Sequence, residues 1–314
     1  MTSTDALVVT APDQMQLQER EVPPPGPDEV QVEVAAVGLN FIDVYQRQGV
    51  YDVPRPFVMC SEGAGTVVGT GERVAWGQHL GSAAGVVNVP RAAVVPVPDG
   101  VELDVAAASM LQGMTAHYLV SSTYAVLPGD VALVHAAAGG VGQLLVQMIT
   151  ARGGEVIATA GTADKRAIAT RLGARAVIDY TTSDDLAADV REANNGNGVH
   201  VVYDGVGKDT FDASLASLRP RGTMVLFGGS SGQVPPFDPQ RLNKGGSLFL
   251  TRPTLAHYIA TRDELLERAG DVLSAIASGE LAVEIGGRYP LAEAARAYED
   301  LEGRRSTGKL LLVP

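Results

Sequence analysis

The chain has 314 residues, of which 46% are hydrophobic and 19% are charged, and its formal net charge is −12 at pH 7. This length and composition suit two packed domains and exclude wholesale disorder. The acidic charge disfavours nucleic acid and anionic membranes as partners, and no uninterrupted run of about 18 apolar residues is present to span a bilayer. The start, MTSTDALVV, lacks the basic segment of a signal peptide, and the single cysteine, Cys60, cannot form an internal disulfide. We therefore expect a cytoplasmic protein.

The first part of the chain predicts short β-strands separated by turns. The candidate strands are Val30–Val37, Gly63–Gly69, Arg73–Trp76 and Val86–Val97. From about Val101 onward, strands alternate with helices, which is typical of a parallel sheet with crossover connections. Six strands are predicted there, at Val131–His135, Val156–Thr159, Ala176–Ile178, Val199–Tyr203, Thr223–Phe227 and Leu248–Thr251. Helices are predicted between them at Ala163–Leu172, Asp184–Ala193 and Asp209–Leu218.

The alternation stops after Thr251. Thr261 and Glu264 have the spacing of a capping box, which predicts a helix that runs to Ser278. A helical stripe at 291–301 and a strand at 309–313 follow, and we expect this segment to pack on the N-terminal strands. The predicted fold class is α/β, with a doubly wound Rossmann domain (residues 113–253) inserted into a mostly β domain (residues 1–112 and 254–314).

The strongest chemical signal is the apolar strand and glycine-rich turn at residues 131–142, followed at once by an amphipathic helix. Glycines let the backbone approach a pyrophosphate, and the helix start offers unpaired N–H groups to it. Ala137 replaces the first glycine of the usual G-x-G-x-x-G pattern. The sequence therefore predicts a dinucleotide site whose turn residues are Ala138, Gly139, Gly140, Val141 and Gly142.

The second predicted strand distinguishes the two nicotinamide cofactors. NAD-binding domains usually have an acid at the end of this strand to hold the ribose hydroxyls. Here the strand ends Ala158-Thr159-Ala160-Gly161-Thr162, without an acid, and Lys165 and Arg166 follow. Positive charge near a 2′-phosphate favours NADPH over NADH.

A catalytic zinc ion needs three converging ligands, and the sequence does not offer them. The five histidines are scattered, and the segment Cys60-Ser61-Glu62 stands where zinc alcohol dehydrogenases carry Gly-His-Glu. Without a metal to polarise an alkoxide, reduction of an electron-poor acceptor is favoured over alcohol oxidation. A quinone fits best, and an activated enone or alkenal fits second best.

Several segments together resemble the zeta-crystallin-like quinone oxidoreductases, the zinc-independent, NADPH-using branch of the medium-chain dehydrogenase/reductase superfamily. The resemblance covers nearly the whole chain. It rests on Gly38–Gly49, Tyr51, Pro54, Pro56-Phe57, Glu62–Gly65, His135–Gly142, Gly161–Lys165, Val202–Gly207, Phe227–Ser231 and Thr251–Pro253. It implies a GroES-like catalytic domain beside the Rossmann domain and an assembly such as a homodimer.

The resemblance also implies roles for individual residues. Gly161, Lys165, Tyr180 and Arg304 would bind the adenosine 2′-phosphate, with Thr162 beside them. The nicotinamide end would be contacted by Thr115, Phe227, Gly228 and Ser230. Asn40, Tyr45 and Tyr51 would line the substrate cleft as the catalytic residues. Simpler roles remain open, since Asn40 and Asp43 could cap a turn and both tyrosines could be packing residues.

The chain departs from the family pattern in the substrate domain. Cys60 stands where a glycine is usual, the loop 68–74 is shorter, and the segment 81–84 lacks an aromatic residue. These departures affect the identity of the acceptor and leave cofactor binding untouched. Three functions stay open: NADPH-dependent quinone reduction first, enone or alkenal reduction second, and a non-catalytic NADPH-binding or RNA-binding role third.

Overall fold

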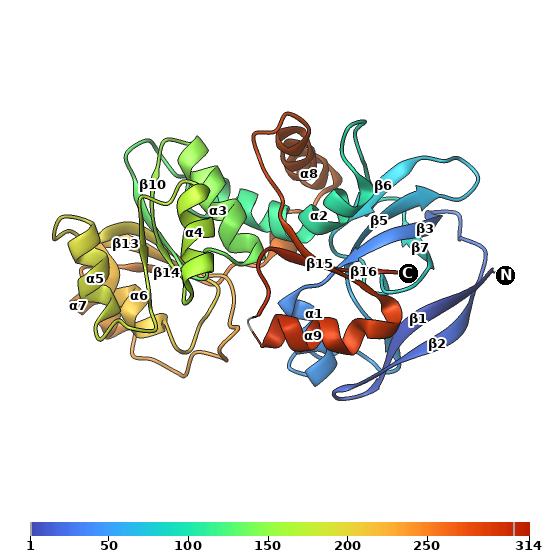
Figure 1. Ribbon diagram of the computed structural model, residues 1–314, viewed down its shortest axis with the longest axis horizontal. Coiled ribbons are helices and arrows are strands. Elements are labelled where there is room, and N and C mark those ends of the chain that lie inside the picture. The colour runs from blue at the N-terminus through green and yellow to red at the C-terminus, as the bar shows by residue number, and fades with distance from the viewer. Residues whose placement is uncertain (1, 304) are drawn as a thin grey trace. The chain divides into compact units, whose positions relative to one another are not determined.

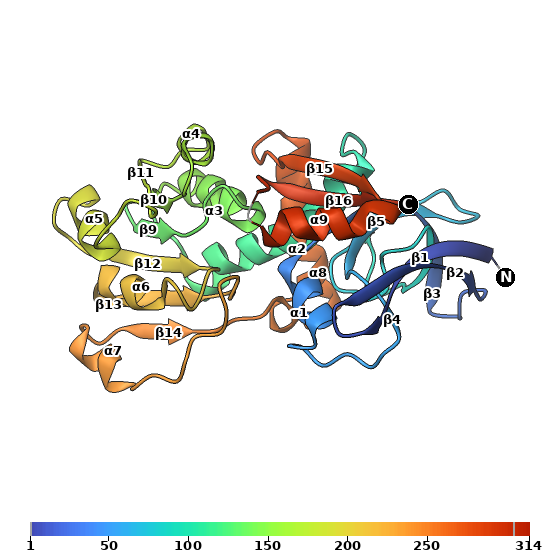
Figure 2. The same ribbon diagram turned by 60° about the horizontal axis from the view of Figure 1, so that its bottom comes forward.

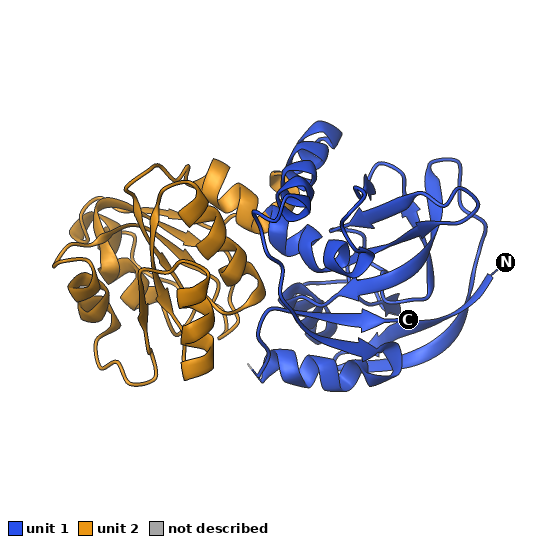
Figure 3. Ribbon diagram, turned by 45° about the horizontal axis from the view of Figure 1, so that its top comes forward, with its two compact units in different colours: residues 1–114, 259–314 blue, residues 115–258 orange. Residues whose placement is uncertain are grey.

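The computed structural model describes residues 2–303 and 305–314. The chain forms two compact units, which Figure 3 shows in different colours. Unit 1 contains residues 1–114 and 259–314, and unit 2 contains residues 115–258. The boundaries lie two and five residues beyond those expected from the sequence. The long helix α2 (Leu103–Tyr118) carries the chain from unit 1 into unit 2.

Unit 2 is built on a six-stranded parallel sheet in the order β11-β10-β9-β12-β13-β14 (Figure 2). Its strands are β9 (Val131–Val134), β10 (Glu155–Thr159), β11 (Ala176–Ile178), β12 (Val199–Asp204), β13 (Leu218–Leu226) and β14 (Phe249–Thr251). The strand order reverses between β9 and β12, so the crevice at their carboxyl ends is the expected ligand site of a doubly wound fold. All six predicted strands are present, and the predicted fold class is confirmed.

The helices of unit 2 cover this sheet. They are α3 (Gly140–Ala151), α4 (Ala163–Arg171), α5 (Leu186–Ala193), α6 (Phe211–Ser217) and the short α7 (Gln240–Lys244). Helix α3 packs on β9 and β10, while α6 packs on β12 and β13 and contacts α5. Gly173 ends α4 with a φ of 111°, a left-handed conformation that glycine adopts without strain.

Unit 1 contains two β-sheets (Figure 1). A three-stranded sheet joins β2 (Gln14–Val22), β1 (Thr2–Ala11) and β4 (Phe57–Val58). The larger sheet has the order β15-β16-β3-β5-β6-β8, with β7 also paired to β3. Its strands are β3 (Glu29–Gly38), β5 (Glu62–Val67), β6 (Arg73–Trp76), β7 (Val86–Pro90), β8 (Val95–Pro96), β15 (Ile285–Pro290) and β16 (Lys309–Val313). Because β16 pairs with β3, the C-terminal segment completes the sheet that the N-terminal strands begin.

Three more helices belong to unit 1, namely α1 (Phe41–Gln48), α8 (Arg262–Ala277) and α9 (Ala294–Glu302). The predicted capping box starts α8, because Thr261 Oγ1 accepts from the Glu264 N–H at 3.2 Å and the Glu264 carboxylate accepts from the Thr261 N–H at 3.1 Å. The sequence did not predict α1, α2 or the β1–β2 hairpin. Helix α1 leaves the end of β3 directly, and it carries three of the residues discussed below.

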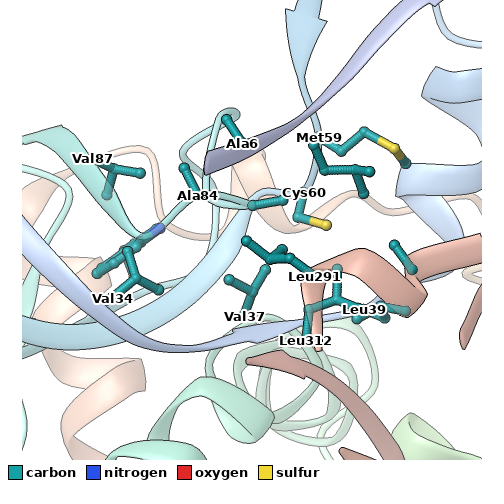
Figure 4. Close-up of a cluster of buried hydrophobic side chains, with 14 of the residues drawn as sticks. Ala6, Val34, Val37, Leu39, Met59, Cys60, Ala84, Val87, Leu291 and Leu312 are labelled. Atoms are coloured by element: carbon teal, nitrogen blue, oxygen red, sulfur yellow. The ribbon is translucent and has the colours of Figure 1, made fainter. Parts of the chain in front are cut away.

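Cys60 lies in the main core of unit 1, among Met59, Ala84 and Leu291 (Figure 4). Its φ is 65°, which is the left-handed region where a side chain is strained. The turn therefore has the backbone that the usual glycine would adopt without cost. The departure from the family pattern changes the side chain and leaves the turn in place.

Candidate functional site

The glycine-rich turn after β9 has the geometry of a pyrophosphate cradle. Helix α3 begins at Gly140 with Gly139 as its N-cap, and helix geometry leaves the first N–H groups without acceptors inside the helix. A Cβ on Gly142 would lie 2.3 Å from the carbonyl oxygen of Ala136, so only glycine fits there. The Gln143 side chain donates to the Ala138 carbonyl at 2.9 Å and fixes the turn. The predicted residues 138–142 thus lie in one compact turn at a helix start, a geometry that suits an anion.

A buried hydrogen-bond chain lies at the carboxyl ends of β9, β10 and β12. Thr159 Oγ1 lies 3.1 Å from His135 Nδ1, and His135 Nε2 lies 2.9 Å from Ser214 Oγ. Ser214 Oγ donates to the Asp204 carboxylate at 2.7 Å, so it must accept from the Nε2–H of His135. The Thr159 hydroxyl then donates to Nδ1. Burial lowers the pKa of His135, although Asp204 opposes the shift, and the neutral imidazole fits both contacts.

Asp204 holds the turn that follows β12. Its Oδ1 accepts from the backbone N–H groups of Val206 at 2.8 Å and Gly207 at 2.9 Å. The next turn, after β13, interlocks with this one, because a Cβ on Gly228 would lie 2.5 Å from the carbonyl oxygen of Gly205. This packing places Phe227, Gly228 and Ser230 at the carboxyl edge of the sheet, and the Ser230 N–H donates to the Gly205 carbonyl at 3.2 Å. The sequence did not reveal His135, Ser214 and Asp204 as a connected group.

The end of β10 has no acid and is closed by an aromatic ring. A Cβ on Gly161 would lie 2.9 Å from the hydroxyl oxygen of Tyr180, so the ring rests against the glycine. Thr162 caps α4 by accepting from the Lys165 N–H at 3.3 Å. Three of the residues expected to bind a 2′-phosphate, Gly161, Tyr180 and Lys165, therefore belong to one segment of unit 2. Arg304, the fourth, lies outside the described residues.

Arg166, the second basic residue after β10, forms an ion pair with a carboxylate. Its guanidinium forms a salt bridge with Asp179, the residue directly after β11.

Thr115, expected at the nicotinamide end, lies on α2 within unit 2, and 8% of its surface is exposed.

In unit 1, Asn40 is held by four hydrogen bonds. Its amide nitrogen donates to Glu62 at 2.8 Å and to the Gly38 carbonyl at 3.2 Å. Its amide oxygen accepts from Lys309 at 2.7 Å and from Gln112 at 3.2 Å. Asn40 is only 3% exposed, and an amide has no further hydrogen-bonding capacity. The geometry therefore favours a positioning role for Asn40 over direct contact with an acceptor.

A buried ion pair fixes Asn40. Lys309 Nζ lies 2.6 Å from Glu62 Oε2, and both side chains are 1% exposed or less. Glu62 also accepts from the Leu111 N–H in α2 at 2.7 Å. The loop after β3, the strands β5 and β16 and the helix α2 thus meet at one polar cluster.

The two candidate tyrosines lie together at the end of α1. The rings of Tyr45 and Tyr51 are 5.5 Å apart in an edge-to-face arrangement, and Phe41 lies 6.4 Å from Tyr45. Tyr51 is 41% exposed. Gly49 turns the chain at a φ of 83°, and the Tyr51 N–H donates to the Tyr45 carbonyl at 3.1 Å. Two phenol groups are therefore presented by one short, fixed element.

A second buried polar group consists of Asp43, Tyr298 and Cys60. Asp43 Oδ2 accepts from the Asn40 N–H at 2.7 Å and from the Tyr298 hydroxyl at 3.4 Å, and that hydroxyl lies 3.2 Å from Cys60 Sγ. Asp43 Oδ1 is buried and has no hydrogen-bond partner among the described residues. Burial raises the pKa of Asp43 to about 7, and the Asn40 N–H and the charge of Lys309 oppose it. Asp43 is the third residue of α1 and accepts from the N–H of the N-cap residue Asn40, which is a structural role, as expected.

Within residues 2–303 and 305–314, no group of three or more His, Cys, Asp or Glu side chains is placed to hold a metal ion. Among these same residues, no helix is long and apolar enough to cross a bilayer.

Known families match both parts of the chain. Residues 26–128 match the alcohol dehydrogenase GroES-like domain, and residues 140–273 match the zinc-binding dehydrogenase family. The chain is 42% identical to quinone oxidoreductase 1 of Escherichia coli over 96% of both chains. It is 39% identical to a 2-haloacrylate reductase of a Burkholderia species, again over 96% of both.

Among solved structures, a mycobacterial protein complexed with NADPH is similar to the chain. It is 45% identical over 99% of this chain and 100% of its own, with a TM-score of 0.96. The similarity to quinone oxidoreductases spans both units and agrees with the glycine turn, the acid-free β10 and the GroES-like strands. The chain therefore belongs to the quinone oxidoreductase family of the medium-chain dehydrogenase/reductase superfamily.

Proposed function

We propose that this protein is an NADPH-dependent quinone oxidoreductase that transfers hydride without a metal ion. The observation that carries the proposal is the end of β10, where Gly161 is packed under Tyr180, Lys165 follows, and no acid is present. An acid there would hold the ribose hydroxyls of NADH, whereas this arrangement suits a 2′-phosphate. Glu62, from the segment that supplies metal ligands in zinc relatives, is engaged by Lys309.

The residues of unit 2 fit the parts of the cofactor. Residues 138–142 would hold the pyrophosphate, because Gly142 leaves room for the turn against the helix start. Gly161, Thr162, Lys165 and Tyr180, with Arg304, would hold the adenosine 2′-phosphate. Thr115 and the turn of Phe227, Gly228 and Ser230 would contact the nicotinamide end.

NADPH supplies a hydride when it is bound. The chain's own residues orient the acceptor and stabilise the charge that develops on its oxygen. We assign this contact to the hydroxyl groups of Tyr45 and Tyr51, and we assign to Asn40 the positioning of α1 through Glu62 and Lys309. A quinone suits this site because its reduced oxygen is a weakly basic phenolate, which a phenol hydrogen bond can stabilise.

The test is consumption of NADPH and NADH against a panel of quinones and enones. We expect quinone-dependent loss of NADPH with poor use of NADH. Tyr45→Phe is expected to lower kcat severalfold and to leave the dissociation constant of NADPH unchanged. The matched control is Tyr289→Phe, which removes another hydroxyl of unit 1, the one bonded to Asp300 at 2.8 Å. Unchanged turnover of Tyr45→Phe across all quinones would remove Tyr45 from the mechanism.

The similarity to a 2-haloacrylate reductase supports a second candidate, the reduction of an activated double bond. This reaction needs a proton donor at the α-carbon as well as the hydride. Turnover with enones and none with quinones would establish it. Tight NADPH binding without any turnover would instead support the non-catalytic role.

We also propose a cytoplasmic homodimer formed at β14. This strand is the edge of the sheet in unit 2, it pairs with β13, and its Phe249 is 61% exposed. An exposed apolar edge strand can pair with a second copy. Light scattering is expected to give a dimer mass for the wild type and a monomer mass for Phe249→Lys. A monomeric wild type would end this proposal, and cell fractionation tests the compartment.

A further inference from the structure

An acidic residue lies next to the expected ribose pocket although β10 itself ends without one. Strand β11 runs parallel to β10, and Ile178 pairs with Thr159 at its end. Asp179 follows Ile178 directly, and Tyr180 and Thr181 then lie against Gly161, where a Cβ would be 2.9 Å from Tyr180 and 3.1 Å from Thr181. Asp179 is therefore the residue directly before Tyr180, whose ring covers Gly161.

Two neighbours restrain this carboxylate. Thr181 donates to Asp179 Oδ1 from its backbone N–H at 3.0 Å and from its hydroxyl at 2.6 Å. Arg166, on the first turns of α4, forms a salt bridge with Asp179 Oδ2. The hydrogen bonds from Thr181 and the charge of Arg166 lower the pKa of Asp179, so it is a full negative charge at neutral pH.

We propose that the Arg166–Asp179 pair determines the cofactor specificity of this site, by cancelling the charge of an acid that would otherwise repel a 2′-phosphate. The inference rests on the proposed use of NADPH and explains how this chain achieves it. Arg166 acts through Asp179 and is a positioning residue, whereas Lys165 supplies the net positive charge. The pair also ties α4 to the end of β11, which keeps Tyr180 against Gly161.

The net charge of three residues sets the expected effect of each variant. Lys165, Arg166 and Asp179 together carry +1, and Arg166→Ala lowers this sum to 0. Asp179→Asn raises it to +2, and the double variant returns it to +1. Asp164, on the first turn of α4, keeps the same charge in every variant. A change of one charge among these three residues is expected to change the affinity for a dianion about three- to tenfold at low salt.

The experiment measures binding by calorimetry with two probes, adenosine 2′,5′-bisphosphate and adenosine 5′-monophosphate, and KM for NADPH and NADH. We expect Arg166→Ala to weaken binding of the bisphosphate and to raise KM for NADPH about three- to tenfold, with the monophosphate and NADH unaffected. Asp179→Asn is expected to bind the bisphosphate at least as tightly as the wild type. The double variant is expected to recover wild-type affinity, because its charge sum is the same.

Arg175→Ala is the matched control. Arg175 pairs with Glu155 and so ties the start of β11 to the start of β10, at the amino ends of both strands. Thr159 lies four residues after Glu155 along β10, about 13 Å of strand, which is longer than the screening distance in physiological salt. Arg175→Ala thus removes an ion pair and a positive charge but leaves the expected ribose pocket unchanged. We expect this variant to discriminate between the two probes as the wild type does.

The outcomes separate this inference from the proposed function. If the double variant binds the bisphosphate as weakly as Arg166→Ala, Arg166 contacts the phosphate itself and the charge-cancelling role is wrong. If Arg166→Ala leaves the discrimination unchanged while the wild type prefers NADPH, the inference fails and the proposed function stands. If the wild type binds both probes equally and prefers NADH, the proposed use of NADPH fails.

Discussion

The two units each bury a polar cluster close to a candidate site, and the two clusters differ in their chemistry. In unit 1, Asn40 is held by the ion pair of Lys309 and Glu62. In unit 2, Asp204 is held by neutral donors, among them the backbone N–H groups of Val206 and Gly207. Breaking an ion pair leaves an uncompensated buried charge, whereas loss of one neutral donor leaves the others in place. Unit 1 is therefore the more fragile under substitution.

The largest expected effect comes from breaking the ion pair. Lys309→Met leaves Glu62 buried without its counter-charge and is expected to lower the free energy of unfolding by about 3–5 kcal/mol. Lys309→Met combined with Glu62→Gln removes both charges and is expected to recover a large part of this loss. Urea denaturation measures both variants. A double variant as unstable as the single one would show that the pairing of charges is not the cause.

The next largest effect is the pH dependence of stability, which we expect to come from Asp43 in unit 1. The folded pKa of Asp43 is about 7 and its ordinary value is 3.8, so the folded protein binds this proton more tightly than the unfolded chain does. The free energy of unfolding should therefore fall as the pH rises from about 4 to 7, by about 1.4 kcal/mol per unit at most, and this contribution levels off above 7. Asp43→Asn should remove the fall, and Asp52→Asn, an exposed carboxyl of unit 1, should keep it. Equal pH profiles for wild type and Asp43→Asn would contradict the assignment.

A smaller effect is expected in unit 2. Ser214→Ala deprives the Nε2–H of His135 and one oxygen of Asp204 of a partner, which should cost about 1–3 kcal/mol of stability. Because the same chain holds the two turns at the carboxyl edge, KM for NADPH should rise while kcat changes little. Ser217→Ala is the control on the same helix, since Ser217 donates to the Ala213 carbonyl of its own helix at 2.7 Å. Equal KM values for both variants would confine Ser214 to folding.

The smallest effect concerns Cys60 and its left-handed backbone. Cys60→Ala keeps the strain and loses the contact with Tyr298, whereas Cys60→Gly loses more atoms but relieves the strain. We expect Cys60→Gly to be no less stable than Cys60→Ala, with a difference of about 1 kcal/mol or less. Melting temperatures decide this comparison. A clearly less stable glycine variant would show that packing outweighs the strain.

The sequence predicted unit 2 better than unit 1 for physical reasons. Strands such as β9 are continuous apolar runs because both faces of a parallel sheet are buried, and Gly173 marks the end of α4. By contrast, most residues of β2 are exposed and polar, so no alternating pattern revealed it. Helix α1 is only 8 residues long, which is too short for a helical stripe. The family resemblance pointed to Asn40, Tyr45 and Tyr51, which lie on or beside this helix, although it did not reveal what binds Asn40.

The long-range partners could not be predicted at all. Lys309 and Glu62 are 247 residues apart, and the chain between them includes the whole of unit 2. A local pattern cannot report a pairing that depends on β16 returning to β3. The same reason hid the connection of His135 to Ser214, which are 79 residues apart.

The saturated amide of Asn40 has a consequence for how this enzyme family can diversify. Because the side-chain hydrogen bonds of Asn40 are made to other residues of the protein, the position of Asn40 does not depend on the molecule being reduced. Under the proposed assignment, acceptor choice is then left to Tyr45 and Tyr51, which are not members of the buried ion pair of Lys309 and Glu62. The proposal therefore predicts that single substitutions at Tyr45 and Tyr51 change acceptor preference while Lys309 and Glu62 keep their pairing.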